Sequence, residues 1–199
     1  MKIYGILLSG KQGSGKTTTS NKLKKYAEDN GIKFFSVKFA DTLYEMHNAI
    51  KAIARTKGIP MPEKDGKLLQ LLGTEWGRNG YGENIWVDAA KNAVANIIEA
   101  NFNQNIMIVI DDCRFPNELV AFNNFLTVRL VADRDARKVR TDSWRDTENH
   151  LSETALDDFA NNFDLFIDTT IASSDEAVRI IIENVNKGVK SNANISATV

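Results

Sequence analysis

Short apolar runs alternate along the chain with segments in which apolar residues recur at helical spacing. The runs are rich in β-branched and aromatic residues, and the run at residues 106–110 shows no polar alternation. A strand without polar alternation is typical of a parallel sheet that helices cover on both faces. The pattern therefore predicts a three-layer α/β fold with strands at residues 3–8, 34–39, 106–110, 126–131 and 165–167.

The longest helical stretch separates the second expected strand from the third. Asp41 is suited to cap a helix, further helical pieces are expected at about residues 67–72 and 85–100, and a glycine-rich turn at residues 73–82 lies between them. About 65 residues therefore connect two neighbouring strands, which is far more than a crossover requires. This insertion is where we expect a pocket for a second substrate.

The remaining helices are marked by their ends. The first is expected from about residue 15 to 29, where Gly31 can adopt the left-handed conformation that follows a helix. Pro116 is suitably placed to open a helix, and Ser152 can cap another that reaches about residue 162. Ser173 begins a segment with capping-box spacing before a last helix to about residue 186.

The turn between the first strand and the first helix has the sequence GKQGSGKT at residues 10–17. This is the pattern of the P-loop, in which glycines let backbone N–H groups surround phosphate oxygens at a helix N-terminus. Lys16 would reach the β- and γ-phosphates, and the Thr17 hydroxyl would bind Mg²⁺. We therefore predict an ATP site formed by Gly10, Gln12, Gly13, Ser14, Gly15, Lys16, Thr17 and Thr18.

Composition limits the classes of protein to consider. The chain has 199 residues, 43% of them hydrophobic, and a formal net charge of −1, so we expect one domain over residues 1–199 and no general attraction to nucleic acid or anionic membranes. Cys113 is the single cysteine, which suits a reducing cytoplasm. No apolar run approaches the roughly 18 residues that span a bilayer, and we expect a soluble protein.

Two adjacent carboxylates end the third expected strand. In P-loop proteins a carboxylate at this place holds the metal ion or its water shell, and Asp111 is the preferred candidate. Asp112 competes for the same role, and the sequence leaves the choice between them open. Acidic residues also end strands where the chain emerges into solvent.

A basic segment follows the fourth expected strand. Arg134, Arg137, Lys138 and Arg140 fall within one arc of a helix, and such a cluster could stabilise a phosphoryl group during transfer. We prefer Arg137 and Lys138 for this role and assign Arg134 to ATP binding. The alternative is a solvated helix face whose cations pair with the interleaved aspartates.

Candidates for the second substrate lie on the insertion and at the neighbouring strand end. Arg114 should project from the same sheet edge as the P-loop, and Arg78 could hold the same acceptor phosphate through two parallel hydrogen bonds. Each could instead form a structural ion pair, with Glu118 or Glu75. Gln70 could read a base edge, or it could equally be exposed.

The aromatic residues and histidines allow a functional and a structural interpretation. Trp144 offers a face on which a base could stack, whereas Trp86, on an apolar helix face, is expected in the core. His47 and His150 are not spaced as metal ligands, so we expect them to cap or to pack.

Taken together, these motifs resemble the bacteriophage deoxynucleoside monophosphate kinases, within the nucleoside monophosphate kinase branch of P-loop proteins. The resemblance covers nearly the whole chain and rests on residues 10–17, 39–41, 68–74 with Arg78, and 111–118. It implies a five-stranded parallel sheet of order 2-3-1-4-5, a monophosphate-binding insertion at residues 42–102, a lid at 133–150 and a frayed tail at 188–199.

The resemblance also implies an activity, namely transfer of the ATP γ-phosphoryl group to a deoxynucleoside monophosphate with Mg²⁺ as cofactor. Arg114 joins Lys16 and the lid cations as a catalytic residue, and the implied monophosphate site comprises Asp41, Gln70, Arg78, Arg114 and Trp144. The expected partners are small nucleotides, and the sequence leaves a homodimer open as well. The expected location is the cytoplasm, of an infected host cell if a phage encodes the protein.

Two other functions fit part of the sequence. A P-loop kinase for another phosphorylated metabolite would use the same loop and arginines. A regulatory nucleotide-binding switch or assembly ATPase would need the loop alone, but the chain has no obvious partner-binding extension or basic DNA-binding stripe.

Overall fold

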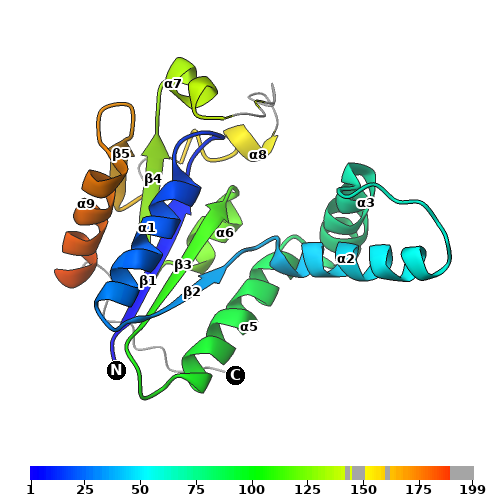
Figure 1. Cartoon of the computed structure of the whole chain (residues 1–199), viewed down its shortest axis with the longest axis horizontal. Coiled ribbons are helices and arrows are strands. Elements are labelled where there is room, and N and C mark those ends of the chain that lie inside the picture. Colours follow the sequence, from blue (N-terminus) through cyan, green and yellow to red (C-terminus); the bar gives the residue numbers. More distant parts are fainter. Residues whose placement is uncertain (142–143, 145–150, 160–161, 189–199) are drawn as a thin grey trace.

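The computed structural model describes residues 1–141, 144, 151–159 and 162–188 (Figure 1). Within these residues, five parallel strands form one sheet in the order β2-β3-β1-β4-β5, which confirms the predicted fold class and strand order. The strands are β1 (Ile3–Ser9), β2 (Lys33–Val37), β3 (Ile106–Cys113), β4 (Leu126–Val131) and β5 (Leu165–Asp168).

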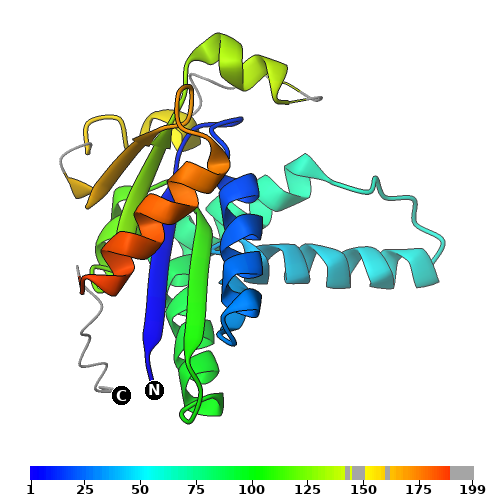
Figure 2. The ribbon, with the colours of Figure 1, turned by 60° about the vertical axis from the view of Figure 1, so that its left-hand side comes forward.

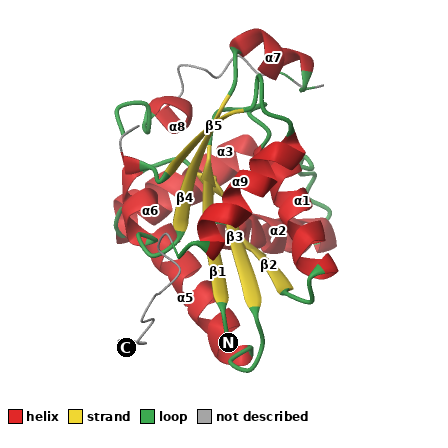
Figure 3. Ribbon diagram, turned by 90° about the vertical axis from the view of Figure 1, so that its left-hand side faces the viewer, coloured by secondary structure: helices red, strands yellow, loops and turns green. Residues whose placement is uncertain are grey.

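Helices cover the two faces of the sheet (Figure 3). On one face, α1 (Lys16–Asp29) and α9 (Ser174–Asn186) pack against β1 and β4 through Leu23, Ile181 and their neighbours. On the other face, α5 (Ile85–Ala100) and α6 (Pro116–Ala121) bury Val94 and Leu119 against the sheet. Residues 106–110 of β3 are fully buried, because this strand is covered on both sides.

The insertion between β2 and β3 is helical throughout most of its length. It contains α2 (Asp41–Thr56), α3 (Gly66–Gln70), the π-helix η1 (Leu71–Arg78) and α4 (Asn79–Tyr81), followed by α5. Helix α2 projects away from the sheet and α3 lies beside it, in two views of the molecule (Figures 1 and 2).

The expected glycine-rich turn at residues 73–82 is wrong, because most of that span is helix. Gly77 shows the reason: a Cβ atom there would lie 2.6 Å from the ring of Trp86. Here glycine allows two helices to approach each other, rather than turning the chain. Trp86 is 5% exposed and donates its Nε1 hydrogen to the Gly73 carbonyl oxygen at 2.9 Å, so its predicted core position is confirmed.

Two helix starts differ from expectation in detail. Asp41 does not cap α2 but is its first residue, and its side chain accepts a hydrogen bond from the Lys38 N–H at 2.8 Å. Ser173 caps α9 as predicted, accepting from the Glu176 N–H. His47 is buried and lies 3.2 Å from the Asp65 backbone nitrogen through Nε2, which confirms a packing role.

The helix predicted from Ser152 to about residue 162 is much shorter in the structure. Helix α8 (Leu151–Thr154) ends after four residues. Beyond it Leu156 is 2% exposed and Asp157 pairs with Lys11 and Arg129, so tertiary contacts on the P-loop side redirect the chain. His150, most of the second half of the predicted lid and residues 189–199 of the predicted tail lie outside the described residues.

No helix among the described residues is long and apolar enough to cross a membrane.

Candidate functional site

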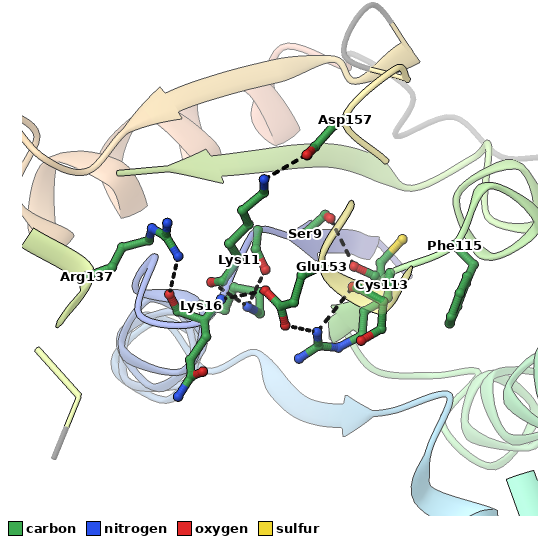
Figure 4. Close-up of polar contacts among 12 residues, drawn as sticks. Ser9, Lys11, Lys16, Cys113, Phe115, Arg137, Glu153 and Asp157 are labelled. Carbon is green, nitrogen blue, oxygen red and sulfur yellow. Dashed lines mark hydrogen bonds and ion pairs between the residues drawn. The ribbon is translucent and has the colours of Figure 1, made fainter. Parts of the chain in front are cut away.

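The P-loop joins the end of β1 to the start of α1 (Figure 4). Gly13 and Gly15 have φ angles of 78° and 93°, in the left-handed region that glycine adopts without strain. A Cβ atom at Gly13 would also lie 2.6 Å from the Arg137 carbonyl oxygen. Gly13 therefore meets two demands at once, a left-handed backbone and close packing under α7 (Arg134–Val139).

Lys16 lies at the first position of α1, with its ammonium group folded back over the loop. Its Nζ donates to the carbonyl oxygens of Gly10 at 2.5 Å and Lys11 at 3.2 Å. Burial, together with the nearby positive charge of Arg114, lowers the pKa of Lys16 to about 8. A buried cation whose charge is incompletely compensated favours binding of an anion such as a phosphate.

A pocket of about 490 Å³ lies along this loop, and we name it the donor pocket after the ligand predicted for the loop. It contains most of the predicted ATP-binding residues and adds Arg140, which holds Thr169 through hydrogen bonds to its hydroxyl and carbonyl oxygens at 3.2 and 2.8 Å. Arg140 belongs to the predicted basic segment but was not among the predicted site residues. The lining residues are Gln12, Gly13, Ser14, Gly15, Lys16, Thr17, Thr18, Arg140 and Thr141.

The basic segment after β4 contacts the P-loop through Arg137. Arg137 is 6% exposed, and its guanidinium donates to the carbonyl oxygens of Gln12 at 3.2 Å and Ala132 at 3.1 Å. Trp144 lies beside Arg137 and Lys138, with its ring centre 5.4 and 5.8 Å from their cationic groups. The structure thus places Trp144 with the predicted lid cations Arg137 and Lys138. Arg134 and Lys138 lie on exposed positions of α7.

Asp111 and Asp112 are successive residues of β3 and have different surroundings. Asp111 lies 3.2 Å from the Lys38 ammonium and is close enough to Lys16 for its charge to raise the Lys16 pKa. Asp112 accepts hydrogen bonds from the N–H groups of Phe39 and Ala40, at 3.0 and 3.1 Å, and burial raises its pKa to about 6. Of the two, Asp111 is the one near the P-loop lysine.

The residues present fit a magnesium ion bound together with a nucleotide. The buried Asp111 Oδ1 has the Lys38 ammonium at 3.2 Å and no other hydrogen-bonding partner among the described residues, and Thr17 lines the donor pocket. One carboxylate and one hydroxyl, completed by phosphate oxygens and water, is the ligand set that Mg²⁺ commonly takes. The described residues hold no group of three or more His, Cys, Asp or Glu side chains placed to bind a metal.

A second pocket, of about 240 Å³, lies between the insertion and the end of β3, and we name it the acceptor pocket after the ligand predicted for Arg78 and Arg114. It brings together Arg78 and Arg114, as predicted from their positions in the sequence. Asp41 and Gln70 do not line it, since Asp41 bonds the Lys38 N–H and Gln70 is exposed. The lining is Phe39, Ala40, Leu43, Leu69, Gly73, Thr74, Arg78, Trp86, Asp112, Arg114, Phe115 and Glu118.

Arg78 is held in the acceptor pocket by two contacts. Its Nη2 lies 3.4 Å from the Glu118 carboxylate, and its guanidinium stacks 4.0 Å from the centre of the Phe115 ring. Glu118 is 3% exposed and accepts from the N–H groups of Arg114 and Phe115 at 2.7 and 3.1 Å. The Arg78–Glu118 ion pair considered from the sequence is therefore present, and it orients Arg78 in this pocket.

Two acidic residues of the segment after the lid approach the P-loop, and sequence reasoning missed them. Glu153 pairs with Arg114 and accepts from the Gln12 N–H at 2.9 Å, while Asp157 pairs with Lys11 at 2.7 Å and with Arg129 at 2.9 Å (Figure 4). Their spacing, with one carboxylate four residues after another, is the one signal that the sequence offered.

Comparison with known sequences gives partial matches. No family model matches the chain. Uncharacterized protein ORF77 of Ictalurid herpesvirus 1 is 33% identical over 115 residues, 58% of this chain and 46% of that protein. The signal recognition particle 54 kDa protein of Archaeoglobus fulgidus is 36% identical over 115 residues, 56% of this chain and 21% of that protein. The chain thus spans less than half the length of these curated relatives.

Comparison with solved structures extends over most of the chain. TT1252 from Thermus thermophilus superposes with a TM-score of 0.59 at 14% identity, covering 92% of this chain and 98% of that one. A shikimate kinase from Acinetobacter baumannii, solved with shikimate, has a TM-score of 0.48 at 15% identity, covering 94% of each chain. The sheet order and the loop after β1 give this chain a three-layer α/β fold with a P-loop at the end of its first strand.

Proposed function

We propose that the protein is a deoxynucleoside monophosphate kinase, which transfers the γ-phosphoryl group of ATP to a deoxynucleoside monophosphate and releases the diphosphate and ADP. One observation carries the proposal: Arg114 lines the acceptor pocket, and through Glu153 it is connected to the P-loop of the donor pocket. A kinase that transfers a phosphoryl group from one nucleotide to another needs two adjacent binding sites.

Phosphoryl transfer of this kind needs no covalent enzyme intermediate, because the acceptor phosphate is already a nucleophile. The protein has to align two polyanions and offset their repulsion. In the proposed mechanism Lys16 and the loop N–H groups hold the donor phosphates, and Arg78 and Arg114 hold the acceptor phosphate. Mg²⁺ bound near Thr17 and Asp111 would add charge stabilisation at the donor phosphates.

The acceptor pocket has the composition that a nucleoside monophosphate requires. Two guanidinium groups can bind a phosphate through paired hydrogen bonds. Apolar side chains from the insertion and the β2 end, including Phe39, Leu43 and Leu69, offer contact to a base or sugar. The preference for deoxyribose rests on the sequence resemblance, so the same pocket also supports the alternative of another phosphorylated metabolite as acceptor.

A steady-state screen tests the proposal. ATP and Mg²⁺ are combined with each common ribo- and deoxyribonucleoside monophosphate, and formation of diphosphate is measured. We expect transfer to at least one deoxynucleotide. Lys16→Ala should abolish it, because the loop loses its phosphate-binding cation, whereas Lys24→Ala, at an exposed position of α1, should retain it.

The screen also separates the alternatives. If no monophosphate is phosphorylated while another phosphorylated metabolite is, the fold carries a different kinase activity. Slow ATP hydrolysis that no acceptor changes, together with a rate that depends on a protein partner, would favour a regulatory switch.

A further inference from the structure

Glu153 connects a residue that lines the donor pocket, Gln12, to a residue that lines the acceptor pocket, Arg114. Its carboxylate is 7% exposed, with one oxygen accepting from the Gln12 N–H at 2.9 Å and the other paired with the Arg114 guanidinium. Arg114 also donates to the Ser152 carbonyl oxygen at 3.3 Å. Figure 4 shows Glu153 beside Lys16. One short segment after the lid therefore contacts the P-loop and a side chain of the acceptor pocket together.

The charges around this carboxylate explain why it is needed there. Arg114 and Lys16 repel each other, and the charge of Arg114 lowers the Lys16 pKa while that of Glu153 raises it. An acid between two cations offsets their repulsion. Without Glu153, repulsion from Lys16 would favour Arg114 conformations that point away from the P-loop. The Arg114 side chain is 34% exposed, so such conformations are sterically open to it.

We propose that Glu153 is a positioning residue, which holds Arg114 against the P-loop so that its guanidinium faces the acceptor phosphate next to the transferred phosphoryl group. This inference rests on the proposed function and adds a residue to it. Glu153 acts through Arg114 and touches no reacting atom. Orientation of a charged group in this way contributes to transfer itself rather than to binding of ATP.

The test is Glu153→Gln, which keeps the shape of the side chain and its acceptor for the Gln12 N–H but removes the charge. For the best monophosphate, kcat should fall about ten- to a hundredfold, the range expected when a charge-assisted hydrogen bond is lost. The dissociation constant of ATP, measured without acceptor, should stay the same or decrease, because a negative charge near the phosphates is gone. Asp158→Asn, an exposed acid of the same segment, is the matched control and should keep the wild-type kcat.

A double-mutant cycle shows whether Glu153 acts through Arg114. In an Arg114→Ala background, Glu153→Gln should have little further effect on kcat, because the group that it positions is gone. Equal effects in the two backgrounds would overturn the proposal. So would a raised kcat with tighter ATP binding, which would mean that the carboxylate competes with a phosphate for its place.

A readout independent of activity separates this inference from the proposed function. In ¹⁵N spectra of the labelled protein, the Arg114 guanidinium signal should be protected from solvent exchange in the wild type and lose that protection in Glu153→Gln. If the wild type phosphorylates no monophosphate, the proposed function fails, while this spectrum still reports on the Glu153–Arg114 contact. An unprotected signal in the wild type would refute the positioning role by itself.

Discussion

Three of the buried carboxylates around the two pockets, those of Asp112, Glu118 and Glu153, differ in how their charge is compensated. Burial raises the pKa of Asp112 to about 6 and of Glu118 to about 7, although each accepts backbone hydrogen bonds. Burial acts in the same direction on Glu153, but its hydrogen bond and ion pair with Arg114 outweigh it, and its pKa is lowered. Of these three carboxylates, one is therefore firmly ionised, and the ionisation of the other two costs stability.

The raised pKa of Glu118 predicts a dependence of stability on pH. Between its ordinary pKa of 4.5 and about 7, the folded protein binds more protons than the unfolded chain, so the free energy of unfolding decreases as pH rises through this window. From pH 5.5 to 7.5 the loss through this group is about 2 kcal/mol. Denaturant unfolding at the two pH values should show it as a difference between the wild type and Glu118→Gln, in which this loss is absent.

The exposed residue Glu99 provides the control for that measurement. Glu99→Gln should keep the pH dependence of the wild type, because its carboxylate faces water. If Glu118→Gln and the wild type lose the same stability between pH 5.5 and 7.5, the burial of Glu118 does not raise its pKa as described.

At the scale of single elements, the helices of the insertion present Arg78 to the acceptor pocket. The π-helix η1 ends at Arg78, and the residue before it, Gly77, packs directly on Trp86 of α5. The hydrogen bond from Trp86 of α5 to the carbonyl oxygen of Gly73 in η1 is a second contact between the same two helices. The position of Arg78 thus depends on how closely η1 and α5 pack.

Gly77→Ala tests this packing. The new Cβ would lie 2.6 Å from a Trp86 ring carbon and 2.8 Å from the Leu72 carbonyl oxygen, so we expect a loss of about 1 to 3 kcal/mol in the free energy of unfolding. The KM for the monophosphate should rise as well, since Arg78 is displaced. Chemical denaturation and initial-rate kinetics measure the two effects.

Gly80→Ala, three residues further along, is the matched control. Its Cβ would be 3.6 Å from the Glu75 carbonyl oxygen, which is an ordinary contact, and alanine favours helix by up to about 1 kcal/mol. Unchanged or increased stability is expected. A Gly77→Ala protein as stable as this control would contradict the close packing.

At the scale of the whole molecule, the sheet is tightly packed, whereas helix α2 of the insertion is much less buried. Residues 106–110 of β3 are fully buried, whereas the described side chains of α2 that are buried are His47 and Ala54, and Ile53 is 64% exposed. Local opening is easiest where few apolar contacts are lost. The insertion is therefore suited to move when an acceptor binds.

Hydrogen exchange should show this difference. Amides in the distal half of α2 should exchange much faster than those of β3, which exchange by global unfolding. A bound monophosphate should slow exchange at residues 66–81, and a non-hydrolysable ATP analogue should slow it at residues 10–20. Equal protection of α2 and β3 would contradict the lower local stability of the insertion. Protection of residues 66–81 by the ATP analogue alone would contradict two separate pockets.

Residue patterns and the general properties of parallel sheets are sufficient to predict part of the fold and of the site from the sequence. Apolar runs define the five strands, and the spacing of Gly10, Gly15, Lys16 and Thr17 defines the P-loop. The rule that parallel strands share one ligand-binding edge predicts that Arg114 lies near this loop. Each of these depends on residues that are close in the sequence or on a general property of parallel sheets.

The tertiary structure alone decided which of these residues contact one another. It set Arg137 against the Gln12 carbonyl oxygen, separated Trp144 from the acceptor pocket, and joined Glu153 to Arg114. It also made a helix of the glycines between residues 73 and 82, because Trp86 packs on Gly77. These contacts connect segments distant in sequence, and their geometry depends on the packing of whole elements, which neither periodicity nor residue spacing records.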